Sequence, residues 1–300
     1  MIKRTLYFGQ PARIRLKQNQ LQIEYNDTEN NSKSVPVEDI GMVIIDNQRV
    51  SVTHGIINSL IEHNAAILWC NNSHMPNGLI LPMSAGHIFT KKLRCQLKAT
   101  EPLKKQLWKQ TVQAKIRNQA AVVEWLGRDG QPLRKMASRV GSGDSENIEG
   151  QAAFLYWQLL FSNDSGFIRH RYGPPPNHML NYAYAILRAV IARSLVASGC
   201  LPAVGIFHKN QYNAFCLADD IMEPYRPIVD KLVLQTLIDF QNEIPDELSL
   251  DLKRHLLQIP VLDVTVEKQN SPLMVGAQRT TASLMKCFEG TRRKINYPEM

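Results

Sequence analysis

Glu149 is the first residue of the sequence whose surroundings suggest chemistry. It lies in the segment DSENIEGQAA at 144–153, after a glycine-containing turn and before a continuous apolar segment. Asp144 or Ser145 is suited to cap a helix there, because a short side-chain oxygen accepts from a free backbone N–H. Glu146 and Glu149 would then share one face of the first turns. A carboxylate that enters a buried face needs a cation or a hydrogen-bond partner, so we expect Glu149 to have a partner elsewhere in the chain.

A second group of candidate ligands lies some sixty to seventy-five residues further on. His208 ends the apolar run AVGIF, which is typical of a short strand, and the segment ADDIMEPYR at 218–226 follows. Asp220 and Glu223 are three residues apart, and Asp219 and Glu223 are four apart, so that either pair can share a helix face. Apolar neighbours on both sides place Asp220 near the buried edge of that helix.

Each of these residues also has an ordinary structural explanation. A lone histidine such as His208 is more often a core or turn residue than a ligand, and Asp219 and Glu149 suit the positive end of a helix dipole. Glu223 is placed to form a surface ion pair with Arg226. Taken together, however, carboxylates and one imidazole are ligand types that bind Mg²⁺ or Mn²⁺. Zinc is less expected, because no cysteine and no second nearby histidine fits such a site.

The charge distribution points to a polyanionic partner. The 300-residue chain has a net charge of +8 and a pI of about 9.2. Thirteen Lys and Arg but only three acidic residues lie between 88 and 140, so that this stretch carries +10 and the rest of the chain −2. Such a concentration is typical of nucleic-acid binding, although a solvated helical face would look similar. Basic residues beside a carboxylate–metal site indicate phosphodiester chemistry, in which a metal polarises the phosphoryl oxygen.

Several other classes of protein fit the sequence poorly. It has no long uncharged apolar run and no amino-terminal secretion signal, which favours a cytoplasmic protein without membrane contact. The five cysteines are scattered without a Cys-x-x-Cys pair, which indicates reduced thiols rather than disulfides or a zinc site. A helical di-metal oxidase would need Glu-x-x-His pairs on two helices, whereas His208 ends an apolar run.

The elements that must position these residues fall into two parts. Alternating or continuous apolar runs predict strands in the first 86 residues, together with one helix at 52–64 and a polar loop at 26–33. These strands are expected at 5–8, 12–17, 21–25 with a preceding turn at 19–20, 35–37, 40–45, 65–70 and 78–82. Apolar residues at helical spacing predict helices in the remainder. These are expected at 88–99, 101–126, 132–140, from the 144–153 segment onward, 179–198, 215–240, 246–257 and 271–288.

The predicted fold class is therefore α+β with two domains. An N-terminal β-domain, residues 1–86, precedes a larger all-α catalytic domain, residues 87–300, which begins with a basic helical DNA-binding linker at 88–140. We also expect the small residues after Glu149 to make room for the helix that carries Glu223.

Seven stretches of the sequence resemble the CRISPR-associated integrases, the universal DNA-adaptation endonucleases of CRISPR systems. They follow the family's order over most of the chain. These stretches are VPVEDIG at 35–41, THG at 53–55, HMPNG at 74–78, NIEGQAA at 147–153, NHMLNYAY at 177–184, GIFH at 205–208 and LADDIMEPYRP at 217–227. The length of the chain and the segment EPLKKQLW at 101–108 are similar to the type II subgroup, which accompanies a single large RNA-guided nuclease.

The resemblance implies a catalytic metal site and a set of partners. The family's ligands are a glutamate, a histidine and a later acidic residue, which match Glu149, His208 and Glu223. Asp220 matches a nearby acidic position that is the last ligand or its support in some members, so the choice between Glu223 and Asp220 stays open, with Glu223 ranked first. The implied partners are double-stranded and branched DNA, a second copy bound through the β-domain, and the smaller CRISPR adaptation subunit in a heterohexamer. The RNA-guided effector nuclease is a further candidate.

The reaction that the resemblance implies is DNA integration. The 3′-hydroxyl ends of captured DNA fragments would attack phosphodiesters at the edge of the CRISPR repeat, with Mg²⁺ or Mn²⁺ stabilising the developing charge. Two alternatives remain open. One is a stand-alone structure-selective nuclease that uses water as the nucleophile. The other is a non-catalytic nucleic-acid-binding scaffold whose carboxylates are helix caps and ion pairs.

Overall fold

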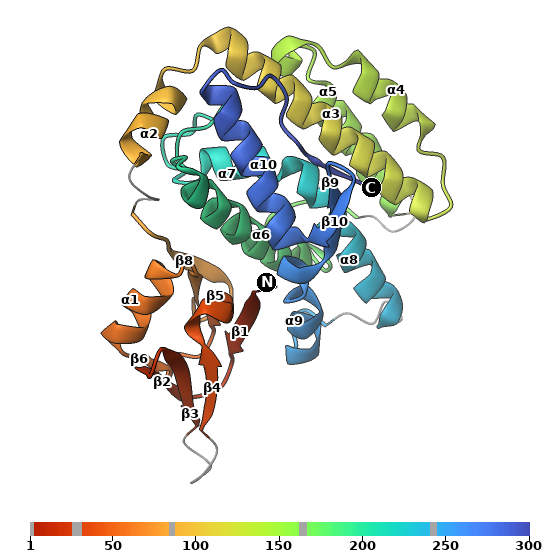
Figure 1. The fold of residues 1–300 in the computed structure, drawn as a ribbon. Coiled ribbons are helices and arrows are strands. Elements are labelled where there is room, and N and C mark those ends of the chain that lie inside the picture. Colours follow the sequence, from red (N-terminus) through yellow and green to blue (C-terminus); the bar gives the residue numbers. More distant parts are fainter. Residues whose placement is uncertain (1–2, 26–31, 84–87, 162–166, 241–244) are drawn as a thin grey trace. The chain divides into compact units, whose positions relative to one another are not determined.

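The computed structural model describes residues 3–25, 32–83, 88–161, 167–240 and 245–300. The chain divides into two compact units, residues 1–85 and residues 86–300 (Figure 1). Strands dominate the first unit and helices the second, which confirms the α+β class.

The described residues of the N-terminal unit form two four-stranded sheets and one α-helix. One sheet has the order β1-β5-β7-β8, in which only β8 is antiparallel to its neighbour, and the other has the order β4-β3-β2-β6. Their elements are β1 (Arg4–Phe8), β2 (Ala12–Lys17), β3 (Gln20–Tyr25), β4 (Lys33–Pro36), β5 (Ile40–Ile45), β6 (Ser51–Val52), α1 (His54–Glu62), β7 (Ala66–Cys70) and β8 (Pro76–Ile80). Both sheets and α1 contribute side chains to one apolar core. All six residues of β5 are buried, as its continuous apolar sequence predicts.

The hairpin between β2 and β3 turns one residue earlier than predicted. Gln18 and Asn19 have φ values of 49° and 57°, and β3 already begins at Gln20. Left-handed backbone at two successive residues suits the tight turn of a twisted hairpin. Most of the polar loop predicted at 26–33 lies outside the described residues.

The C-terminal unit is built around the long helix α3 (Glu101–Trp125). This helix packs against α4, α5 and α8 and against two short 3₁₀ turns, η2 and η4 (Figure 1). The other elements are α2 (Phe89–Leu97), α4 (Gln131–Arg139), η2 (Ser142–Asp144), α5 (Ile148–Leu160), α6 (Asn177–Ser198), α7 (Cys216–Met222), η4 (Glu223–Tyr225), α8 (Arg226–Asp239), α9 (Leu250–Leu256), η5 (Ile259–Val261) and α10 (Leu273–Phe288). Because eleven of its residues are buried, α3 is a core helix rather than part of a linker.

The C-terminal unit is not all-α, contrary to the prediction. It also contains a three-stranded antiparallel sheet of order β10-β9-β11, formed by β9 (Asp263–Val266), β10 (Gln269–Pro272) and β11 (Pro298–Glu299). Val264 and Val266 alternate with polar residues and are buried, and Glu267 and Lys268 turn the hairpin with positive φ. This short period-2 pattern predicts a strand. The strand β10 occupies the first residues of the helix predicted at 271–288.

Two further predictions about the C-terminal unit are wrong in detail. Residues 201–208 form turns instead of a strand, and α9 begins at Leu250 rather than at 246. The side chain of Ser249 caps α9 by accepting from Leu252 N, which sets its first turn.

One described helix, α6, is long and apolar enough to cross a membrane, but 83% of its most apolar window is buried inside the protein, as in a core helix.

Candidate metal centre

The start of α5 fixes the position of Glu149. The carboxylate of Asp144 accepts from the backbone N–H groups of Ile148 and Glu149, both at 2.9 Å, and Asn147 Oδ1 accepts from Gly150 N at 3.3 Å. The N-cap is Asn147 rather than Asp144 or Ser145, although Asp144 does satisfy two of the free N–H groups. Glu149 is therefore the second residue of α5, and the hydrogen bond from its backbone N–H to Asp144 fixes its position.

Glu146 does not share a helix face with Glu149, contrary to the prediction. It precedes the helix, is exposed, and lies 3.8 Å from Arg139.

The small residues after Glu149 also have a different role from the one expected. A Cβ on Gly150 would lie 2.8 Å from the side chain of Asn147, so this glycine makes room for the cap, and α5 packs mainly on α3 and α4.

The loop that carries His208 folds around the carboxylate of Asp220. Asp220 Oδ2 accepts from Ile206 N at 2.7 Å and from Phe207 N at 3.0 Å, while Oδ1 accepts from His208 N at 3.2 Å. His208 Nδ1 lies 2.6 Å from the same Oδ1. The loop approaches so closely that a Cβ on Gly205 would lie 2.8 Å from Asp220 Oδ2. Asp220 is completely buried, and both of its oxygens are already engaged.

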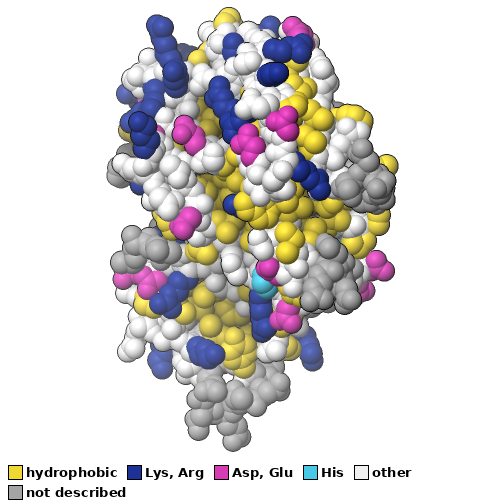
Figure 2. Space-filling model, turned by 90° about the vertical axis from the view of Figure 1, so that its right-hand side faces the viewer, with side chains coloured by type: hydrophobic (Ala, Val, Ile, Leu, Met, Phe, Trp, Pro, Cys, Tyr) yellow, Lys and Arg dark blue, Asp and Glu magenta, His cyan; other side chains and the backbone are white. Residues whose placement is uncertain are grey.

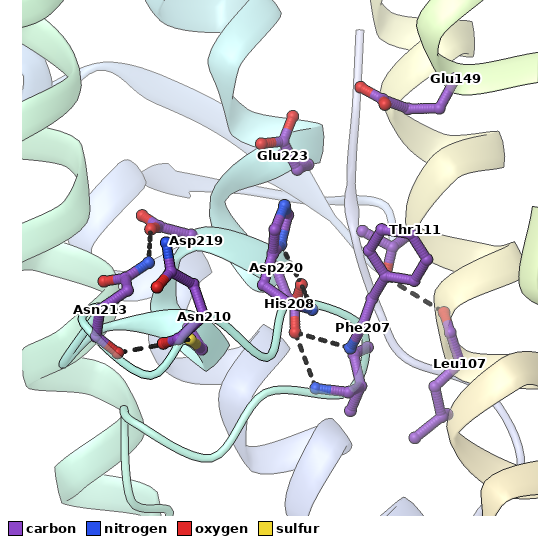
Figure 3. A network of polar contacts seen from close by, with 12 residues as sticks. Leu107, Thr111, Glu149, Phe207, His208, Asn210, Asn213, Asp219, Asp220 and Glu223 are labelled. Carbon is purple, nitrogen blue, oxygen red and sulfur yellow. Dashed lines mark hydrogen bonds and ion pairs between the residues drawn. The ribbon is translucent and has the colours of Figure 1, made fainter. Parts of the chain in front are cut away.

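The imidazole of His208 is therefore oriented by Asp220. With Nδ1 bonded to the carboxylate, the other ring nitrogen is directed to the side where Glu223 lies (Figure 3). The hydrogen bond with Asp220 raises the pKa of His208, although partial burial opposes this.

An aromatic wall supports the same loop. The ring of Phe207 stacks on Trp108 of α3 with a centroid separation of 4.1 Å and an interplanar angle of 1°. The ring of His208 meets both rings edge-on, at 5.8 Å and 5.5 Å. Trp108 is buried, so α3 holds the histidine loop through a rigid contact.

Glu149 and Glu223 converge on one buried cation, Lys115 of α3. Lys115 Nζ lies 2.6 Å from Glu223 Oε2 and forms an ion pair with Glu149 Oε1. On its other side, Glu223 Oε1 lies 2.8 Å from Arg226 Nε. Lys115 and Glu223 are both 7% exposed. Figure 3 shows the carboxylates of Glu149 and Glu223 and the ring of His208 around a shared space.

These charges stabilise one another. Burial alone raises the pKa of Glu223, but Arg226 and Lys115 outweigh it and hold that pKa below its usual value. Burial lowers the pKa of Lys115, but Glu223 and Glu149 outweigh it and hold that pKa above its usual value. Glu223, Lys115 and Arg226 therefore stay charged at neutral pH.

A second polar network joins the helices behind the cluster. Asp230 of α8 accepts from Tyr156 of α5 at 3.0 Å and also from Tyr184 of α6. The guanidinium carbon of Arg226 lies 4.5 Å from the centre of the Tyr184 ring. The network links the helix of Glu149 to the segment of Glu223, so that the two carboxylates cannot separate freely.

Asp219 faces away from the cluster. It pairs with Arg188 at 2.6 Å and accepts from Asn213 at 2.7 Å, so it anchors a loop (Figure 3). Its neighbour on α7, Asp220, is likewise committed to backbone contacts. Of the acidic residues in the 218–226 segment, only Glu223 contacts Lys115, the side chain that Glu149 also contacts.

The donor set fits a hard divalent cation, although it is not gathered into a closed shell. Among the residues that the structure describes, no three His, Cys, Asp or Glu side chains come together as a ready metal cluster. Glu223 Oε2 is buried, and its charge is compensated by the ion pair with Lys115 at 2.6 Å. Carboxylate oxygens with one imidazole suit Mg²⁺ or Mn²⁺.

Comparison with known proteins decides the family. The family model described as CRISPR associated protein Cas1 matches residues 6–246. The chain belongs to the Cas1 family. A relative from Neisseria meningitidis serogroup C, named CRISPR-associated endonuclease Cas1, is 38% identical over 308 aligned residues that cover 100% of this chain and 97% of the relative. The resemblance seen in the sequence is thereby confirmed at the level of the family.

Solved structures share the fold. The chain matches a casposase bound to an integration product with a TM-score of 0.81 and 20% identity, covering 98% of this chain and 92% of that one. It matches a chain of a Cas6-RT-Cas1–Cas2 complex with a TM-score of 0.74 and 19% identity, covering 97% of this chain and 35% of that one.

Sequence reasoning missed Lys115 and the role of Trp108. It did predict the ion pair of Glu223 with Arg226, but on the surface, whereas Glu223 is buried. Lys115 counted in that reasoning only as one of thirteen basic residues. A signal was present, because Thr111, Lys115, Asn118 and Gln119 recur at helical spacing, and all four are buried. A polar stripe on an otherwise apolar core helix indicates a buried network.

The rest of the basic stretch lies largely on the surface. Lys and Arg side chains gather over the upper part of the face drawn in Figure 2, with a few carboxylates among them. The exposed basic residues of 88–140 are Lys91, Arg94, Lys98, Lys105, Arg117, Arg128, Arg134, Lys135 and Arg139. Some are engaged, since Arg134 pairs with Glu124 at 2.6 Å.

Proposed function

We propose that the protein is a metal-dependent DNA integrase and endonuclease of CRISPR adaptation. Membership of the Cas1 family supports the assignment, as does a full-length relative named an endonuclease. The observation that carries it is the convergence of Glu149 and Glu223 on one buried cation, beside an imidazole directed to the same space.

In this proposal Glu149, His208 and Glu223 hold a Mg²⁺ or Mn²⁺ ion. When bound, such an ion polarises a phosphoryl oxygen and stabilises charge on the leaving 3′-oxygen. Asp220 is a positioning residue, because its oxygens already accept four contacts from the histidine loop. This assignment chooses Glu223 over Asp220 as the last ligand.

The protein's own side chains organise the reaction around that ion. Asp220 keeps a proton on His208 Nδ1, which leaves the other nitrogen free to donate electrons. Arg226, stacked on Tyr184, holds Glu223 in place. A DNA 3′-hydroxyl oxygen then forms a bond to phosphorus as the bond to the leaving 3′-oxygen breaks. The number of phosphodiester bonds does not change, and the hydroxyl proton passes to the leaving oxygen through solvent.

The partners follow from the same proposal. The exposed Lys and Arg side chains of 88–140 bind the phosphates of double-stranded or branched DNA. The N-terminal unit forms a homodimer, for which sheet edges are a common route of association. Two dimers join a dimer of the smaller adaptation subunit in a heterohexamer, in keeping with a solved Cas6-RT-Cas1–Cas2 complex that contains a chain of this fold. The assembly acts in the cytoplasm, where the RNA-guided effector nuclease is a further partner.

A strand-transfer assay tests the reaction. A 5′-labelled DNA duplex with free 3′-hydroxyls is incubated with a repeat-containing plasmid, Mn²⁺ and the protein, and products are resolved on a denaturing gel. We expect label joined to plasmid strands, and none with Glu149→Gln or with a duplex that ends in dideoxynucleotides. Nicking without joining would identify a nuclease that uses water, and full joining by Glu149→Gln would contradict the proposed site.

A further inference from the structure

Four buried or half-buried charged side chains in the candidate metal centre balance one another. Glu149 and Glu223 carry two negative charges, and Lys115 and Arg226 carry two positive ones. Burial makes any excess charge costly, because a charge taken out of water must be paired. A divalent cation added to these four side chains would give them two positive charges in excess.

Lys115 contacts the two carboxylates that are proposed to bind the metal. It is the one basic side chain among the described residues that contacts both Glu149 and Glu223. Its Nζ atom lies 2.6 Å from the buried oxygen Glu223 Oε2. A metal that uses these two carboxylates must therefore compete with the ammonium group.

We propose that Lys115 is a displaceable internal cation, which competes with the divalent metal for Glu149 and Glu223 and moves to a DNA phosphate when both ligands bind. The inference rests on the proposed function and deepens it, because it makes metal binding and DNA binding cooperative. The phosphate supplies the negative charge that the ammonium group loses when it leaves the carboxylates.

Lys115 is suited to this movement and Arg226 is not. Lys115 places one ammonium group at the end of a flexible four-carbon chain, and it makes no other ion pair in the described parts of the protein. Arg226 lies beside Glu223 in sequence, and its planar group rests on the ring of Tyr184 at 4.5 Å. Its stacked position keeps Arg226 on Glu223 while Lys115 exchanges partners.

The consequence is a defined thermodynamic coupling. Without DNA, the metal must break two ion pairs of Lys115, so the free protein binds it weakly. With DNA, the ammonium group gains a phosphate, and the metal binds more tightly. Linkage requires that the metal increase the affinity for DNA by the same factor.

Calorimetric titration with Mn²⁺ tests the competition on four full-length proteins. These are the wild type, Lys115→Met, Lys115→Arg and, as a matched control outside the 88–140 stretch, the exposed Lys286→Met. Without DNA we expect Lys115→Met to bind Mn²⁺ more tightly than wild type by about 5–150-fold, the usual range of such couplings. Lys115→Arg and Lys286→Met should stay close to wild type. An unchanged or weaker affinity of Lys115→Met overturns the proposal.

The same titration with DNA tests the transfer of Lys115 to phosphate. The DNA is a duplex that ends in dideoxynucleotides, so that no strand joining occurs. It should tighten Mn²⁺ binding to wild type and to Lys286→Met, but change the affinity of Lys115→Met little. Equal tightening in all four proteins overturns the proposal, because the coupling would then not depend on Lys115.

Thermal unfolding keeps the test decisive if Lys115→Met is unstable. That variant leaves two carboxylates without their shared cation, so we expect a lower unfolding temperature and a larger rise on addition of Mn²⁺ than in wild type. A smaller rise than in wild type contradicts the competition. If Mn²⁺ binds to none of the proteins, the metal site and this inference both fail. If it binds to wild type and Lys115→Met alike, the competition alone fails.

Discussion

At the scale of single residues, the structure separates two carboxylates that the sequence leaves equivalent. Asp220 and Glu223 both lie in one short acidic segment, and their three-residue spacing allows either to face a ligand. In the structure, Asp220 accepts hydrogen bonds from the histidine loop, whereas Glu223 forms an ion pair with Lys115. The deciding contacts come from residues 206–208 and from α3, which are distant in sequence, so no local pattern could reveal them.

Two substitutions distinguish the roles proposed for these carboxylates. Glu223→Gln removes a direct ligand, so we expect no measurable Mn²⁺ binding by calorimetry. Asp220→Asn removes the support of His208, and outer-shell losses of this kind weaken metal affinity by about 10–100-fold. Asp220→Asn should also lower the free energy of unfolding in urea by about 1–3 kcal/mol for each backbone N–H that loses its acceptor.

The exposed carboxylate Glu146 supplies the matched control. Glu146→Gln removes a negative charge close to Glu149 in sequence but makes no contact with the cluster, so Mn²⁺ affinity should not change. If Asp220→Asn abolished Mn²⁺ binding while Glu223→Gln bound it normally, the two assignments would have to be exchanged.

At the scale of elements, α3 and α8 hold the site together. The helix α3 supplies Trp108 to the histidine loop and Lys115 to the carboxylates, two turns apart on one face. The helix α8 supplies Asp230, which joins α5 and α6. The helices themselves could be predicted, because their apolar spacing is regular. Their polar contacts could not, because each joins residues far apart in sequence.

The buried carboxylate of Asp230 gives a pH-dependent stability. Burial raises the pKa of Asp230 to about 6 from 3.8, so the folded protein binds this proton more tightly than the unfolded chain. The stability that the proton contributes is present below about pH 4 and is lost as the pH rises through 6. Relative to Asp230→Asn, the wild type should lose up to ~3 kcal/mol over that range, at 1.36 kcal/mol per pKa unit.

Urea unfolding at several pH values between 4 and 7.5 measures this difference. Asp239→Asn, an exposed change on the same helix, is the control and should follow the wild type at every pH. A constant difference between wild type and Asp230→Asn would show that Asp230 does not exchange its proton in this range.

At the scale of the whole molecule, the two-part pattern of strands followed by helices could be read from the sequence. In the predicted strands of the first part, apolar residues recur at every second position. In the second part they recur about every 3.6 residues, which predicts helices instead of strands. The sheet of β9, β10 and β11 escaped the prediction, because β11 is two residues long and pairs with β9 from the end of the chain. The alternation in β9 is a local signal, but it is only four residues long, and the pairing of β11 leaves none.

The basic surface gives a prediction about the whole complex with DNA. Removal of one side chain that binds a phosphate should reduce the slope of log affinity against log salt by about 0.9 for duplex DNA. Replacing the exposed Lys105 and Arg117 with Ala should therefore weaken binding in fluorescence anisotropy and flatten that slope. Lys286→Ala removes an exposed cation outside the 88–140 stretch and should leave both unchanged. An unaltered slope for the double variant would place the DNA elsewhere.

Anomalous diffraction from crystals grown with Mn²⁺ tests the central claim most directly. We predict a single strong anomalous peak in the helical unit, in contact with carboxylate oxygens of Glu149 and Glu223 and with the ring nitrogen of His208 that does not face Asp220. Lys115 should have moved away from both glutamates. A peak bound by Asp220 or Asp219, or no peak near Glu149 at a Mn²⁺ concentration that supports strand transfer, would contradict the account.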